Sequence, residues 1–117
     1  MRHGRVNVVV VCALVGAIGT VVRIVSISAQ AALPAPWVGN DIGAPAIAGS
    51  SSFSGGTFTI SAAGIDIWST SDQFRYLYQP VSGDVDIIAH VNSLQMADPW
   101  SKAGVMVRES LDPDARH

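Results

Sequence analysis

Short runs of alternating apolar and polar residues constrain the fold of this 117-residue chain more than any other feature of its sequence. The clearest run is Gln73–Gln79, in which Phe74, Tyr76 and Tyr78 occupy every second position. Because successive side chains of a strand point to opposite faces of a sheet, this spacing predicts a strand with one aromatic face. No segment after residue 31 places apolar residues at helical spacing over three turns. The sequence therefore predicts an all-β fold after that point.

Four further runs show the same two-residue period and are separated by glycine and proline turn signals. They are Thr57–Ser61, Ile65–Trp68, Val85–Asn92 and Ala103–Glu109. Many short strands between turns are typical of an antiparallel β-sandwich or jelly roll. We assign residues 53–117 to this sandwich and residues 32–52, which are rich in Ala, Pro, Gly and Ser, to an irregular opening segment.

Residues 1–31 have the composition of a secretory signal peptide. Arg2 and Arg5 give a basic start, residues 6–22 are almost continuously apolar, and Ala29-Gln30-Ala31 places small residues where a signal peptidase cleaves. We predict a hydrophobic leader helix, cleavage after Ala31 and an extracytoplasmic protein. The apolar run of 17 residues is nearly long enough to span a bilayer, so a membrane anchor through residues 6–22 is the alternative.

Charge is divided sharply between the leader and the rest of the chain. All nine acidic residues follow the leader, against four basic ones there, which gives that part a net charge of −5. Nucleic acids and anionic lipids are bound through clustered Lys and Arg. We therefore predict no nucleic-acid partner, and contact with a membrane only through an uncleaved leader.

Two stretches resemble a known family. Gly83–Val91 (GDVDIIAHV) and Asp98–Ser110 (DPWSKAGVMVRES) are similar to the concanavalin A-like sandwich domains of bacterial secreted proteins, among them the C-terminal accessory domain of beta-xylosidase-type glycoside hydrolases and a related family of unknown function. Asp41–Gly43, Gly55–Phe58 and Trp68–Tyr78 resemble the opening strands of that family. The resemblance spans Trp37–His117 and implies a concanavalin A-like jelly roll.

Domains of that family are usually nearly twice as long as the matching part of this chain. We therefore expect only the N-terminal half of the sandwich. Open strand edges promote association between chains. The resemblance implies that further strands, or self-association, close these edges.

The sequence offers no convincing catalytic pair. Glycosidases need two carboxylates flanking the scissile bond, and Asp84 and Asp86 are the only close acidic pair near a strand start. Asp84 follows Gly83 in a turn, and the Glu-x-Asp-x-x-Glu strand of catalytic family members is absent. We predict that the chain is not an enzyme.

Carbohydrate binding without catalysis would use aromatic side chains as stacking platforms together with a few polar groups. Trp68, Trp100 and the neighbouring Asp98 are the candidate ligand-binding residues, and packing within the sandwich is the competing interpretation for both tryptophans. Trp37 is a further candidate, and Tyr76 and Tyr78 are secondary candidates whose alternation with Phe74 is more simply explained by core packing.

No cofactor is predicted. A structural Ca²⁺ ion, which such folds often carry, would require Asp41, Asp66 and Asp72 to converge, because Ca²⁺ takes six to eight oxygen ligands. Lys102 and Arg108 are interpreted as surface charges that pair with Asp98 or Glu109, and His90 as a strand residue that faces solvent or a neighbouring sheet.

Together these features predict a secreted, non-catalytic β-sandwich module that recognises a polysaccharide or a cell-surface glycan. One alternative is an N-terminal fragment of a secreted glycoside hydrolase-type enzyme. The other is a structural or adhesive spacer without a ligand. The carbohydrate assignment rests on family analogy, and a fold does not by itself define a function.

Overall fold

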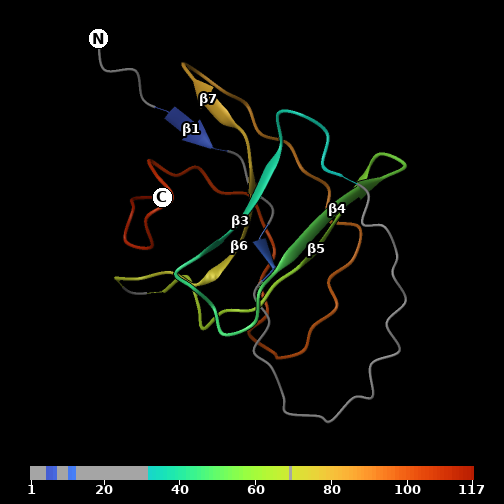
Figure 1. Cartoon of the computed structure of the whole chain (residues 1–117), viewed down its shortest axis with the longest axis vertical. Coiled ribbons are helices and arrows are strands. Elements are labelled where there is room, and N and C mark those ends of the chain that lie inside the picture. Colours follow the sequence, from blue (N-terminus) through green and yellow to red (C-terminus); the bar gives the residue numbers. More distant parts are fainter. Residues whose placement is uncertain (1–4, 8–10, 13–31, 69) are drawn as a thin grey trace.

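A computed structural model describes residues 5–7, 11–12, 32–68 and 70–117 of the chain. Within these residues the regular elements are all strands, which confirms the predicted all-β class (Figure 1). The strands are β1 (Arg5–Asn7), β2 (Val11–Cys12), β3 (Val38–Ile42), β4 (Ser50–Ser54), β5 (Thr57–Ser61), β6 (Phe74–Tyr78) and β7 (Pro80–Ser82). They form three small antiparallel sheets, ordered β1-β7, β2-β6-β3 and β4-β5.

Strand β6 is the centre of the fold and was predicted correctly. Phe74 and Tyr76 are fully buried and pack with Ile42 of β3, as their alternation indicated. Leu77 on the opposite face is also fully buried, so both faces of β6 are covered. A strand with neighbours on both edges and both faces is the natural anchor for the segments around it.

A tight hairpin joins β4 to β5. Gly55 and Gly56 have φ angles of +55° and +81°, the left-handed conformation that a two-residue turn of this type requires at both positions. The turn sets Phe53 opposite Phe58, whose rings lie 4.7 Å apart, and Trp37 packs on Phe58 at 5.0 Å. The predicted run at residues 57–61 is thus confirmed as β5.

The segment 32–52 is more regular than predicted. It contains β3 and the start of β4, although the sequence of β3, VGNDI, has no alternation. The strand exists because β6 supplies a complete ladder of partners, from Val38 opposite Tyr78 to Ile42 opposite Phe74. Strand propensity depends on such neighbours more than on the residues themselves.

Three predicted strands were wrong. Residues 65–68, 85–92 and 103–109 form no strand, although each has the expected alternation. A strand is stabilised by hydrogen bonds to a neighbouring strand, and no described segment runs beside these three in a ladder. The chain after β7, residues 83–117, is instead irregular and winds around the sheets (Figure 1).

The leader was expected to be helical, but its two described pieces are strands. β1 pairs with β7, and β2 pairs with the edge of β6 opposite β3. Valine-rich sequence favours extended backbone, and the free edges of β6 and β7 offer it partners. The rest of the leader, including the predicted cleavage site at Ala31, lies outside the described residues. Among those that are described, no helix is long and apolar enough to cross a membrane.

Candidate functional site

The two tryptophans predicted to bind a ligand are both strongly exposed. Trp68 is 82% and Trp100 76% accessible to solvent, so packing within the fold does not account for either side chain. Large aromatic side chains are usually buried, and two that are almost fully exposed are a notable departure from that tendency. Both lie in irregular segments, Trp68 before β6 and Trp100 near the C-terminal end of the chain.

Asp98 fixes the loop that carries Trp100. Its carboxylate accepts a hydrogen bond of 2.8 Å from the Trp100 backbone N–H, and its carbonyl accepts one of 3.0 Å from the Ser101 N–H. The Asp98 N–H in turn donates to the Ser101 hydroxyl at 3.3 Å. This is a tight turn with Pro99 at its second position, where its fixed φ fits. Asp98 therefore has a structural role in positioning Trp100.

An ion pair joins the loops of the two tryptophans. The Lys102 ammonium lies 2.5 Å from a carboxylate oxygen of Asp66, and these residues stand two positions from Trp100 and Trp68 respectively. The Lys102 hydrogen bond, followed by one of 2.7 Å from the Ile67 N–H, lowers the pKa of Asp66 from its ordinary value. Sequence reasoning had assigned Lys102 to Asp98 or Glu109, which was wrong because it could not place the two loops side by side.

The secondary aromatic candidates are packing residues. Tyr76 is fully buried, and burial raises its pKa. Tyr78 stacks on Tyr76 at 5.1 Å and accepts a hydrogen bond of 3.3 Å from the Asn40 side chain. Trp37 is half-buried against Phe58. Core packing therefore explains the two tyrosines, whereas Trp37 packs on Phe58 outside the core cluster.

The three candidate calcium ligands do not share a site. Each pairs with a different basic side chain: Asp66 with Lys102, Asp41 with Arg75 at 3.4 Å, and Asp72 with Arg108. Asp41 also accepts two hydrogen bonds, of 3.0 and 3.2 Å, from the Gly49 N–H. Among the residues that the structure describes, no three His, Cys, Asp or Glu side chains come together as metal ligands. The convergence that a calcium site would need is not seen.

The pair of Asp72 and Arg108 is buried, which corrects the surface role expected for Arg108. The two side chains are 2% and 0% exposed. The Arg108 guanidinium also donates to the Asp112 carbonyl at 2.6 Å and lies 5.4 Å from the Phe74 ring. His117 approaches the same carboxylate, with Nδ1 at 3.6 Å. This cluster attaches the C-terminal segment to the core beside β6.

The remaining acidic candidates show no catalytic arrangement. Asp84 and Asp86 are exposed beyond β7, and Glu109 is exposed and faces Arg116 at 4.0 Å. His90 faces solvent, one of the two orientations expected, but it lies in no strand, and its Nδ1 lies 2.8 Å from the Asn92 side-chain oxygen.

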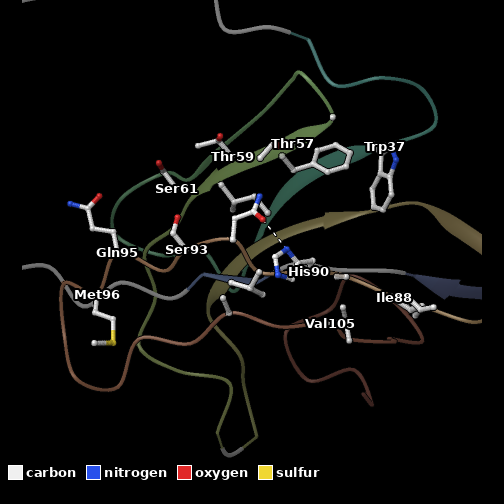
Figure 2. A pocket seen from close by; sticks show the side chains of 18 of the residues that line it. Trp37, Thr57, Thr59, Ser61, Ile88, His90, Ser93, Gln95, Met96 and Val105 are labelled. Atoms are coloured by element: carbon white, nitrogen blue, oxygen red, sulfur yellow. Dashed lines mark hydrogen bonds between the residues drawn. The ribbon is translucent and has the colours of Figure 1, made fainter.

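A groove of about 870 Å³, which the sequence did not reveal, lies between β5 and residues 87–97. Figure 2 shows Thr57, Thr59 and Ser61 on one side of it, His90 opposite them, Trp37 and Ile88 towards one end, and Gln95 and Met96 towards the other. None of the described residues that line it is Asp, Glu, Lys or Arg. The groove is assembled from separate segments, so the only sequence signal for it is the polar alternation of β5.

Comparison with protein-family models, with curated proteins and with solved structures finds no match to this chain.

Proposed function

We propose that this chain is an exported, non-catalytic recognition module of the concanavalin A-like sandwich type that binds a polysaccharide or a cell-surface glycan. One observation carries the proposal: two tryptophans, 82% and 76% exposed, stand on loops joined by the Asp66–Lys102 ion pair. Exposed rings held at fixed positions offer flat apolar surfaces to sugar rings, and nearby polar groups supply hydrogen bonds.

The loop geometry supports this use of the tryptophans. A ring that must stack on a ligand loses less entropy when its backbone is already ordered, and the Asp98 turn orders the backbone of Trp100 before any ligand arrives. The Lys102 ammonium is occupied by Asp66, so the surface around the rings has little free positive charge. A neutral glycan suits this surface better than an anionic one.

The test uses affinity gel electrophoresis and calorimetry with neutral plant and bacterial polysaccharides. We expect millimolar binding, with Trp68→Ala and Trp100→Ala each weakening it at least about tenfold, the loss typical of truncating an aromatic contact. Ile47→Ala is the matched control, because Ile47 is an exposed apolar residue (61%) on a different segment. Absence of retardation and of heat with every polysaccharide, or equal affinities for the tryptophan and control variants, would refute the proposal.

A further inference from the structure

Residues 85–92 combine the sequence of a strand with the absence of a strand partner. Val85, Ile87, Ala89 and Val91 alternate with Asp86, Ile88, His90 and Asn92. The chain runs through this segment without a turn or bend, and none of the described residues pairs with it in a ladder. An extended segment whose backbone N–H and C=O groups have no ladder partner among the described residues can pair with another strand.

The same segment exposes apolar side chains. Ile88 is 96% exposed, the largest value among the exposed apolar residues of the described chain, and Val91 and Val85 are 45% and 39% exposed. Ile87, by contrast, is half-buried. A strand edge flanked by exposed branched apolar residues is a surface at which β-strands from other chains add.

We propose that residues 85–91 pair with the same residues of a second copy of this chain, as an antiparallel, twofold-symmetric pair of strands centred on Ile88. The sequence is self-complementary in this register. Val85 faces Val91 of the second copy, Ile87 faces Ala89, and Ile88 faces itself on the axis. Asp86 faces His90, which joins the one acidic residue of the segment to its one imidazole.

The neighbouring symmetric registers are chemically worse. In a twofold antiparallel pair one residue must face its own copy, so the alternatives within the segment centre on Ile87 or Ala89. Centring on Ile87 places Asp86 opposite Ile88, and centring on Ala89 places Ile88 opposite His90. Cross-strand pairs are favourable when an apolar side chain faces another apolar side chain or when opposite charges face each other. The register centred on Ile88 alone matches apolar with apolar and acid with imidazole.

The structure leaves room for the second strand. The groove of about 870 Å³ separates residues 87–97 from β5, and both Ile88 and His90 line it (Figure 2). The described part of its lining has no Asp, Glu, Lys or Arg side chain, so the apolar face of an incoming strand meets no charge from these residues. The outer edge of β5 has no ladder partner among the described residues either. A strand inserted here gains neighbours on both sides.

The first measurement is the mass of the full chain in solution by light scattering and sedimentation equilibrium. We expect a dimer for the wild type. In Ile88→Lys two ammonium groups face each other at the axis, which raises the dimer dissociation constant at least roughly 100-fold. Ile65→Lys is the matched control, because Ile65 is 77% exposed but lies outside the segment, and it stays dimeric.

Cysteine cross-linking tests the register in a Cys12→Ser background. Residues on the axis have Cα atoms roughly 4.5 to 5.5 Å apart, within disulfide range, so Ile88→Cys forms a cross-linked dimer on mild oxidation. Asp86→Cys does not, because its two copies are offset by four residues, about 13 Å along the strands. A monomeric or openly aggregating wild type, a dimer that persists in Ile88→Lys, or equal cross-linking of the two cysteine variants overturns the proposal. None of these outcomes bears on sugar binding.

Discussion

Removing the guanidinium of Arg108 should destabilise the fold more than any surface substitution. The Arg108 and Asp72 side chains are 0% and 2% exposed, so Arg108→Met leaves a buried carboxylate without its main partner. Breaking a buried pair in this way costs about 3 to 5 kcal/mol, because the remaining charge is no longer compensated. That is a large share of the roughly 5 to 15 kcal/mol that stabilises a typical domain. The carbonyl of Asp112 also loses its hydrogen bond of 2.6 Å.

Equilibrium urea unfolding of the full chain measures the effect as a change in the free energy of unfolding. Arg116→Met is the control, since its pair with Glu109 is 4.0 Å long and mostly exposed, and a change within about 0.5 kcal/mol is expected. If Arg108→Met does not fold, the unfolding free energy of Asp72→Asn tests the same ion pair. Its amide oxygen still accepts from the guanidinium, so a loss of about 1 to 3 kcal/mol is expected. Losses for the Asp72 and Arg108 variants that equal that of Arg116→Met would refute the reasoning.

Two further predictions concern the segment between β5 and β6. The lowered pKa of Asp66 in the folded state gives stability that is present above its unfolded pKa and is lost as the pH falls through the folded value. Between about pH 5 and pH 2, the wild-type protein should therefore lose more unfolding free energy than Asp66→Asn. The difference should be under about 1 kcal/mol, because the pair is partly exposed. Equal losses in the two proteins would contradict this prediction. A Cβ at Gly64 would lie 1.9 Å from the Gln73 carbonyl oxygen, so Gly64→Ala should cost at least about 1 kcal/mol in thermal or urea unfolding. Gly104→Ala, where nothing lies within 4 Å, is the control, and equal stability of the two variants would count against the predicted clash.

Local alternation predicted the strands whose partners lie in the same chain. β5 and β6 were found because glycine turns or aromatic spacing mark them directly in the sequence. β3 was missed because its five residues, VGNDI, carry no period and gain their structure from the β6 ladder. Residues 85–92 and 103–109 were mispredicted for the converse reason: their pattern is that of strands, but the described chain provides no strand beside them.

The sequence supplied the candidate ligand-binding residues but not the contacts that join their loops. Trp100 and Asp98 were proposed from residue type and loop position, and Trp68 from residue type at the end of a predicted short strand. The Asp66–Lys102 pair that joins their loops spans 36 residues, and nothing local in the sequence indicates it. Arg108 shows the same limit, since Arg is rarely fully buried and only the tertiary fold places Asp72 opposite it.

The tryptophan surface and the strand-pairing segment should act independently. The loops of the tryptophans are held to the fold by ion pairs, whereas residues 85–97 have few side-chain links to the rest of the described chain. The ion pairs of Asp66 with Lys102 and Asp72 with Arg108 hold residues 98–117 against the segment before β6. Within residues 85–97, by contrast, the side-chain hydrogen bond seen among the described residues joins His90 to Asn92, two positions away, and does not tie the segment to the sheets. We therefore expect the Ile88→Lys monomer to bind polysaccharide with unchanged affinity per chain, and Trp100→Ala to remain dimeric. Calorimetry with short soluble oligosaccharides is the right assay, because an immobilised polysaccharide would raise the apparent affinity of a dimer through bivalency alone. A loss of more than about tenfold per site in the monomer would mean that pairing completes the sugar-binding surface instead of standing apart from it.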